Sequence, residues 1–147
     1  MPTSFHYPLP NFSFMVEWGG GNTGFQEVIG LEIELQVLEY RDGSAPEYTN
    51  RKLPGLHSFK NVILRRGLVK GDYDCYSWIT SAQLSSIDRR LVTVVLMDDK
   101  QTPAYTWTLA NAWPCRLTYY PLSAQNGQVM IEEIELAHEG MTVVLAQ

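Results

Sequence analysis

The most regular segment of the chain is Leu31-Glu32-Ile33-Glu34-Leu35-Gln36-Val37, in which apolar and polar residues alternate without interruption. A side-chain period of two is that of a β-strand, so the segment predicts a strand with one apolar and one acidic face. The phase then slips, because Leu38 and Tyr40 take the apolar positions on either side of Glu39. A slip of one residue in a continuing strand indicates a β-bulge, and we expect the strand to bend there.

A long connection is expected after this strand. A second strand is predicted over residues 59–67, which are apolar in the middle and basic towards the end, and residues 42–58 lie between the two strands without a periodic apolar pattern. A loop of this length is uncommon in a compact domain and is usually functional or disordered. We therefore expect a mobile loop that contacts another copy of the protein. The expected contact residues are Arg51, Lys52, Leu53, Pro54, Gly55 and Leu56.

Length and charge narrow the class of protein. The 147 residues fit a single domain, 1–147, and the formal net charge of −5 disfavours a protein that grips nucleic acid through its phosphates. The sequence begins without a basic region followed by an apolar run, so we expect no signal peptide and assembly in the cytoplasm. No segment reaches the ~18 consecutive apolar residues of a membrane-spanning helix.

The remaining periodicity predicts a mainly β fold with one helix. Cys75, Trp78, Ile79 and Ala82 share one helical face, so a short helix is expected over residues 73–83, with Asp72 as its N-cap. Together with the two strands above, the other strands make eight in all, and a change of phase at residues 132–133 predicts a second bulge. We expect an antiparallel β-sandwich or partial barrel with one flanking helix. The other strands are expected near residues 11–18, 25–30, 90–97, 105–110, 115–120 and 129–136.

Residues that carry catalysis or hold metals do not form a recognisable motif. The histidines are scattered, and although His138 begins the pattern H-E-x-x-H, Thr142 stands where the second histidine must be. Cys75 and Cys115 lie forty residues apart, so two reduced, buried thiols are expected rather than a disulfide or a zinc site. We expect no cofactor, no metal and no enzymatic activity.

Two further patterns have a functional and a structural interpretation. Residues 19–24 match the dinucleotide-binding pattern G-x-G-x-x-G, but the residues that follow are too few and too β-like for the required helix, which favours a hairpin turn. Glu32 and Glu34 share one strand face and could serve acid–base chemistry, whereas paired acids on an alternating strand usually form a solvated face.

Short blocks in a fixed order carry a family resemblance. The blocks are residues 14–18 (FMVEW), 24–31 (GFQEVIGL), 39–43 (EYRDG), 51–55 (RKLPG), 61–67 (NVILRRG), 111–114 (NAWP) and 135–140 (ELAHEG). In this order they resemble the tail tube family, which forms the inner tubes of contractile phage tails, R-type bacteriocins and extracellular contractile injection systems.

The resemblance implies a structural protein that assembles with itself. The family forms hexameric rings that stack into a hollow tube, with strands of all subunits closing one ring-shaped β-barrel. A strand in such a wall needs an apolar face towards its own core and a hydrated face towards the channel, so Glu32, Glu34 and Gln36 are expected to line the lumen. The implied partners are further copies, sheath and baseplate proteins, and cargo or nucleic acid that passes through the lumen without specific binding. The particle is then a phage tail or an extracellular phage-tail-like particle.

Alternatives remain at this stage. One is a tube-initiator or baseplate-proximal ring protein of the same family, and another is a monomeric β-barrel that binds a small apolar ligand. The sequence does not distinguish a phage tail from a bacteriocin or an extracellular injection system.

Overall fold

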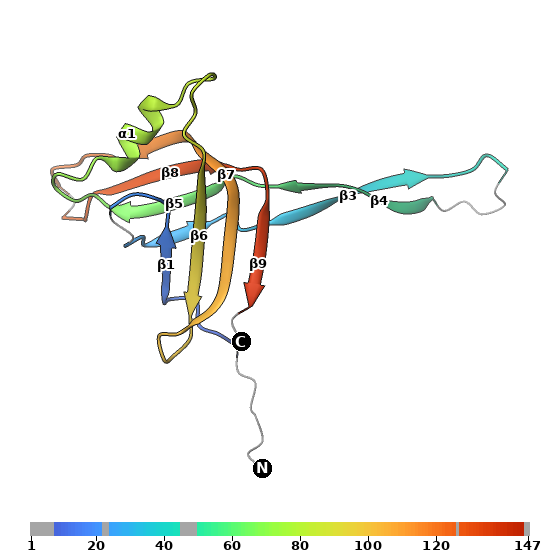
Figure 1. The fold of residues 1–147 in the computed structure, drawn as a ribbon, viewed down its shortest axis with the longest axis horizontal. Coiled ribbons are helices and arrows are strands. Elements are labelled where there is room, and N and C mark those ends of the chain that lie inside the picture. The colour runs from blue at the N-terminus through green and yellow to red at the C-terminus, as the bar shows by residue number, and fades with distance from the viewer. Residues whose placement is uncertain (1–7, 22–23, 45–49, 126, 146–147) are drawn as a thin grey trace, which may run out of the picture.

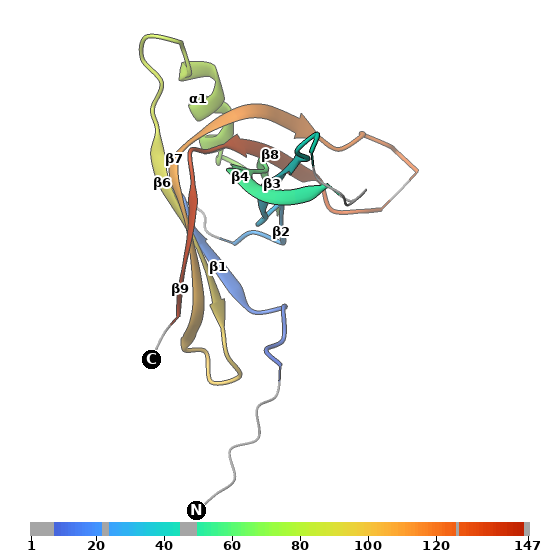
Figure 2. The same ribbon diagram turned by 90° about the vertical axis from the view of Figure 1, so that its right-hand side faces the viewer.

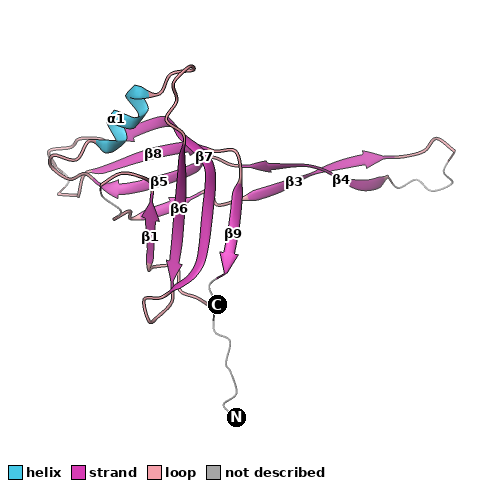
Figure 3. Ribbon diagram, viewed as in Figure 1, coloured by secondary structure: helices cyan, strands magenta, loops and turns pink. Residues whose placement is uncertain are grey.

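The computed structural model describes residues 8–21, 24–44, 50–125 and 127–145, and over these ranges the chain is mainly β with one helix (Figure 3). Figure 1 shows the order of the elements. They are β1 (Phe14–Glu17), β2 (Glu27–Ile29), β3 (Ile33–Tyr40), β4 (Arg51–Phe59), β5 (Val62–Gly67), α1 (Asp74–Ser81), β6 (Arg90–Met97), β7 (Pro103–Tyr119), β8 (Ile131–Ala137) and β9 (Met141–Leu145).

A seven-stranded antiparallel sheet forms the body in the order β1-β6-β7-β8-β5-β2, with β9 also paired to β7. The 17-residue strand β7 belongs to both layers of the body, because its first part pairs with β6 and β9 and its last part with β8. Figure 2 shows β7 curving from one layer into the other. The two strands expected near residues 105–110 and 115–120 are therefore one strand, which passes through Asn111 at a φ of 51°.

Apolar side chains from both layers and from α1 fill the core. Trp18 lies at its centre, with ring centroids 5.8 Å from both Phe25 and Trp78. Cys75 and Trp78 of α1 are buried against the sheet, as the helical periodicity predicted. The strand expected near residues 11–18 begins only at Phe14, and Phe12, which precedes it, is exposed.

The strands β3 and β4 form a separate two-stranded sheet, a hairpin that projects far from the body (Figure 1). The register shifts between Leu35 and Val37, where Gln36 of β3 lies opposite both Gly55 and Leu56 of β4. The extra residue therefore lies in β4, and the predicted bulge in the first strand was wrong. The prediction of a loop over residues 42–58 was wrong, because Arg51–Phe59 is strand β4. Its backbone bonds to β3, and a strand that buries neither face within its own chain needs no regular apolar pattern. Residues 45–49 of the connection lie outside the described residues.

The glycine-rich segment does not make a hairpin. β1 pairs with β6, whereas β2 pairs with β5, so residues 18–26 connect the two layers of the body. A strand rather than a helix follows, which removes the structural context of a dinucleotide fingerprint. Asn22 and Thr23 of the pattern lie outside the described residues.

Three other expectations need correction. The predicted bulge at residues 132–133 was wrong, since Glu132, Ile134 and Leu136 alternate inwards without a break. Tyr73 rather than Asp72 is the N-cap of α1, although the Asp72 carboxylate accepts a hydrogen bond of 3.2 Å from the Asp74 N–H. Of the two free cysteines, Cys75 is buried and Cys115 is exposed. Strand β9 was not predicted, and Asn126 of the expected β7–β8 hairpin signal is not described.

None of the helices that the described residues form is long and apolar enough to cross a membrane.

Candidate self-assembly surface

The β3–β4 hairpin has two chemically different faces, which follow from its register. Side chains directly opposite each other in an antiparallel pair lie on the same face. The pairs Ile33–Phe59, Leu35–His57, Val37–Pro54 and Glu39–Lys52 thus form one face, apolar except for the pair at its outer end, which we name the apolar face. The pairs Glu34–Ser58, Leu38–Leu53 and Tyr40–Arg51 form the opposite, mixed face, where Gln36 lies across from Gly55 and Leu56.

The apolar face is open to solvent in the isolated subunit. Ile33, Leu35 and Val37 are each 43–60% exposed. The expectation that the apolar residues of β3 face the core of their own subunit was therefore wrong. A row of exposed apolar side chains on a projecting hairpin marks an interaction surface rather than a core.

Gly55 lets the two strands pack closely on the mixed face. A Cβ atom built at this position would lie 3.1 Å from the Gln36 carbonyl oxygen and 3.2 Å from Leu38 Cγ. The Leu38 side chain therefore lies across the position that a larger residue would fill. The neighbouring residues of the expected contact segment 51–56 are on β4 and exposed, and Leu56 is 78% exposed.

The residues expected to line a channel lie on and beside β3. Glu34 belongs to the mixed face, and Gln36 stands at the bulge. Glu32 precedes the strand, and its Oε2 lies 3.0 Å from Lys60 Nζ in an exposed ion pair. The hydrogen bond from Glu32 raises the pKa of Lys60. All three side chains are exposed and lie on the same segment of the chain. Glu32 is already paired with Lys60.

The base of the hairpin is anchored to the body. The Phe59 ring lies 5.7 Å from the His138 ring, and His138 Nε2 is 2.9 Å from the Lys60 carbonyl oxygen. Gly30 enters the hairpin at a φ of 99°, and a Cβ there would lie 2.3 Å from the Asn61 carbonyl oxygen. A left-handed backbone in such close contact requires glycine, and these contacts fix the direction in which the hairpin leaves the body.

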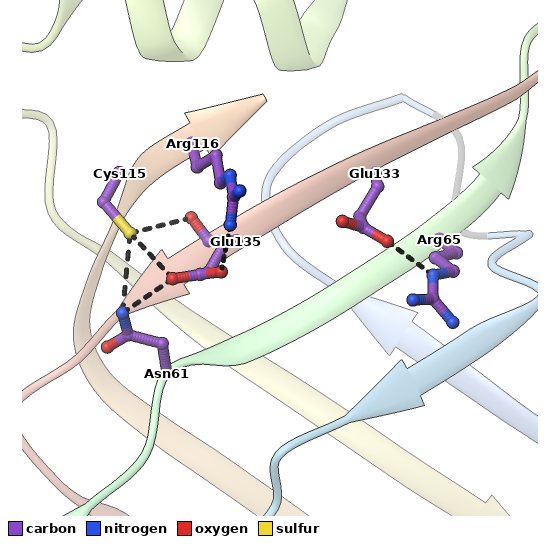
Figure 4. Close-up of polar contacts among 6 residues, drawn as sticks. All are labelled: Asn61, Arg65, Cys115, Arg116, Glu133 and Glu135. Carbon is purple, nitrogen blue, oxygen red and sulfur yellow. Dashed lines mark hydrogen bonds and ion pairs between the residues drawn. The ribbon is translucent and has the colours of Figure 1, made fainter. Parts of the chain in front are cut away.

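A second polar surface lies on the outer face of the layer β2-β5-β8-β7, where cations and acids pair across strands (Figure 4). Arg65 Nε donates a 2.6 Å hydrogen bond to Glu133 Oε1, and Arg65 Nη1 lies 2.9 Å from Glu27 Oε2. Hydrogen bonds to Glu133 and Glu27 raise the pKa of Arg65. The arginine is thus already neutralised by acids of its own chain.

The same surface continues around Glu135. Asn61 Nδ2 donates a 2.9 Å hydrogen bond to Glu135 Oε2, Arg116 Nη1 lies 3.8 Å from Oε1, and Cys115 Sγ is 3.4 Å from the Glu135 carbonyl oxygen (Figure 4). Burial, followed by the nearby Glu135 charge, raises the pKa of the Cys115 thiol, so this thiol is not activated as a nucleophile. Within the described residues no cluster of three or more histidine, cysteine or acidic side chains could hold a metal ion. The arrangement is typical of a hydrated wall rather than a reaction centre.

Comparisons with known proteins show the family to which the chain belongs. The model of the T4-like virus tail tube protein gp19 family matches residues 10–142. The chain belongs to this tail tube family. A comparison with curated proteins finds no match.

Solved tube structures have the same fold. The chain in the anti-feeding prophage cap, a tube-terminating cap, is 27% identical, with 99% of this chain and 97% of that one covered and a TM-score of 0.89. A chain of the sheath-tube complex of PVC, an extracellular contractile injection system, in the extended state is 31% identical over 95% and 93% of the two chains, with a TM-score of 0.86. The PVC sheath/tube terminator is also 31% identical, over 96% and 99%, with a TM-score of 0.86.

More distant structures share the fold alone. Hcp1 from Flavobacterium johnsoniae is 10% identical, with a TM-score of 0.55 and 90% of this chain and 95% of that one covered. Taken together, the matches make this protein a structural tail tube subunit of the contractile injection system type, and place it in a phage-tail-like or extracellular injection particle.

Sequence reasoning found the residues of the hairpin but not their secondary structure or their faces. It missed the Arg65, Glu133 and Glu135 network, whose only signal was a basic strand end at Arg65 and Arg66 and an acidic pair at Glu132 and Glu133. Sequence spacing does not reveal which of these residues face each other, because that depends on the register between β5 and β8.

Proposed function

We propose that the protein forms hexameric rings that stack into a hollow inner tube, and that the β3–β4 hairpin joins each copy to its neighbours. The observation that carries this proposal is the apolar face of the hairpin, which has no cover within its own chain although the hairpin is the longest projection of the molecule (Figure 1). An isolated two-stranded hairpin is marginally stable in water, so it gains from a partner surface.

Apolar burial supplies most of the association energy. Burying a leucine side chain contributes roughly 1.5–3 kcal/mol, whereas an exposed ion pair contributes about 0–1 kcal/mol. Leu53 and Leu56 should therefore stabilise the assembly more than Arg51 and Lys52 do. Pro54 and Gly55 complete the contact segment by shaping the strand between the two leucines.

The part of the mixed face near the body suits a channel wall, because it carries Glu34 and Gln36, whereas Leu38 and Leu53 lie towards the tip. If neighbours cover the apolar face and the tip, the part with Glu34 and Gln36 remains hydrated, with Glu32 beside it. An acidic, hydrated wall discourages acidic cargo or nucleic acid from binding to it, because like charges repel in a confined space. We propose that these residues face the lumen. An assembled structure in which Glu32, Glu34 and Gln36 point away from the tube axis would refute their proposed place in the lumen.

Sheath and baseplate proteins are the further partners that we propose. Two of the similar structures are a PVC sheath-tube complex and an anti-feeding prophage baseplate. The protein acts in these contacts as a structural component without enzymatic activity.

A terminating or initiating ring is the second candidate within the family, because the anti-feeding prophage cap chain covers nearly all of this chain at a TM-score of 0.89. Whether the purified protein elongates distinguishes a main tube subunit from a terminating or initiating ring. A main tube subunit elongates into rods, whereas a cap or initiator stops at single rings. A small-ligand barrel would remain a monomer in light scattering.

A variant of the contact segment tests the role of the hairpin. Leu53, Pro54 and Leu56 are replaced by serine in one variant, and the exposed Leu84, which follows α1, is replaced by serine in a matched control. We expect unchanged circular dichroism in both, rods from the control, and no rods from the hairpin variant in negative-stain images. Rods of normal length from the hairpin variant would contradict the proposal.

A further inference from the structure

His138, which directly follows strand β8, uses both of its ring nitrogens in hydrogen bonds to backbone groups. Its Nδ1 accepts a hydrogen bond of 3.3 Å from the Gly140 N–H. A ring nitrogen that accepts a hydrogen bond carries no proton, so the ring is neutral and its proton is assigned to Nε2. Nε2 then donates to the Lys60 carbonyl oxygen over 2.9 Å. The contacts of this half-buried side chain therefore require one protonation state and one tautomer.

The turn that carries this histidine, residues 138–140 between β8 and β9, is fixed to β7. The Glu139 N–H donates to the Ala110 carbonyl oxygen, and the Ala110 N–H donates to the Gly140 carbonyl oxygen, each over 2.9 Å. These backbone hydrogen bonds do not involve the imidazole. The turn therefore keeps its place on the body whatever the charge of the ring.

The other partner of the ring is the base of the β3–β4 hairpin, which leaves the body beside this turn (Figure 1). Lys60 directly follows β4, and the Phe59 ring before it lies 5.7 Å from the His138 ring. Strands β3 and β4 pair with each other and, in the described part of the chain, with no strand of the body. The His138 side chain thus joins a fixed turn to the base of a projecting hairpin.

The charged groups around His138 already have partners. The charged and titratable groups that the segments around it carry are Lys60, Glu32, Glu139, Arg89, Glu135 and His57. Each of the three carboxylates accepts a hydrogen bond or an ion pair from a neighbouring side chain, and His57 is exposed on β4. None of these three carboxylates is therefore free to form a new ion pair with a protonated His138.

We propose that His138 fastens the base of the hairpin to the body only while its ring is neutral, and that protonation releases this contact. Histidine is the side chain whose charge ordinarily changes between about pH 5 and pH 8. A proton on Nδ1 would make this nitrogen a donor that faces the Gly140 N–H, and two donors cannot share one hydrogen bond. The ring must then turn away, and the hairpin base becomes more mobile as the pH falls.

The contact lies within one subunit, so it exists whether or not copies assemble. A pH-dependent assembly would follow from it, because the hairpin is the segment that we propose to join the copies, and this consequence rests on the proposed function.

Hydrogen exchange, measured by mass spectrometry on full-length subunits, tests the contact. All subunits carry the serine substitutions of the hairpin contact segment, which keep them monomeric, and are compared at about pH 7.5 and about pH 5.5 after correction for the intrinsic exchange rate. The first variant is His138→Gln, whose side-chain amide can still donate to the Lys60 carbonyl oxygen but does not titrate in this range. The matched control is His57→Gln, because His57 is exposed. Circular dichroism confirms that each subunit is folded at both pH values.

In the parent we expect the peptide that covers residues 57–61 to exchange about fivefold faster at the lower pH, the change that the loss of one hydrogen bond gives. His57→Gln should show the same acceleration, and His138→Gln should show none. Nitrogen-15 spectra of the imidazole should place the proton on Nε2 at the higher pH. No acceleration in the parent, equal acceleration in His138→Gln, or a proton on Nδ1 at the higher pH would overturn this inference and leave the proposed function standing.

Negative-stain images of subunits with an intact contact segment test the consequence for assembly at the same two pH values. We expect His138→Gln to form rods at both, and the parent to form rods only at the higher pH. Rods of normal length from the parent at both values would overturn the pH-dependent assembly. If no subunit formed rings or rods at either pH, the proposed function would fail, whereas the exchange rates of the monomers would still decide whether His138 releases the hairpin.

Discussion

Arg66 and Glu132 form an ion pair inside the core, with 2.5 Å between Arg66 Nε and Glu132 Oε1 and with only 1% and 2% of the two side chains exposed. Arg66 Nη2 also lies 3.2 Å from Asp72 Oδ1, and the guanidinium stands 5.1 Å above the Trp18 ring. The pair explains why Glu132 occupies an inward position on β8, since a buried carboxylate requires a partner. It also ties the segment before α1 to β5.

Removing one partner of this pair should be costly. Arg66→Met leaves the buried Glu132 carboxylate without its cation, and breaking a buried pair in this way costs about 3–5 kcal/mol. We expect this loss in the free energy of unfolding, measured by urea and tryptophan fluorescence on subunits kept monomeric by the hairpin substitutions. The double variant with Glu132→Leu should recover most of the loss. If Arg66→Met lowered the free energy of unfolding by less than ~1 kcal/mol, the buried ion pair would not stabilise the core as argued.

Gly30 should tolerate no side chain. Gly30→Ala places a Cβ 2.3 Å from the Asn61 carbonyl oxygen at a φ of 99°, so we expect a loss of about 1–3 kcal/mol or more. Gly140→Ala is the matched control, because nothing lies within 4 Å of its Cβ position and its φ is not positive. The same urea measurement compares them. Equal stability of the two variants would contradict the tight junction at the base of the hairpin.

The two thiols should differ in accessibility. Cys115 is exposed and Cys75 is buried, so a thiol reagent should modify Cys115 in the native subunit and reach Cys75 only after unfolding. Because burial, followed by the Glu135 charge, raises the pKa of Cys115, its modification near pH 8 should be slower than that of an unstructured cysteine peptide. Peptide mass spectrometry identifies the labelled residue. Label on Cys75 in native subunits would contradict the packing of α1.

Burial of Cys75 also predicts a dependence of stability on pH. Burial raises the pKa of the Cys75 thiol from 9.0 to about 12. The folded state then holds the proton more tightly than the unfolded state, so this contribution is fully present below about pH 9 and is lost as the pH rises towards 12. Urea unfolding between these values should show a steeper loss in the parent than in Cys75→Ala. If the stability of the parent and of Cys75→Ala fell in parallel with pH, the loss could not be attributed to the Cys75 thiol.

The sequence predicted those parts of the fold that are buried within one chain. The alternation of Val16 and Trp18 and the periodicity of Cys75 and Trp78 are local signals that the structure confirms. The change of phase at Leu38 indicated a bulge in the wrong strand, because the extra residue lies in β4. Strand β4 was missed because its side chains are buried by no element of their own chain, so Arg51–Phe59 shows no alternation. The inward position of Glu132 was missed because its partner Arg66 lies 66 residues away in sequence.

Imaging of the purified parent protein tests the central claim most directly. We expect negative-stain images of rings with six-fold symmetry or of hollow rods, and a hexamer in native mass spectrometry, because the proposed assembly covers the exposed apolar face of the hairpin. A protein that remains a folded, compact monomer at high concentration, with its hairpin intact, would contradict the account.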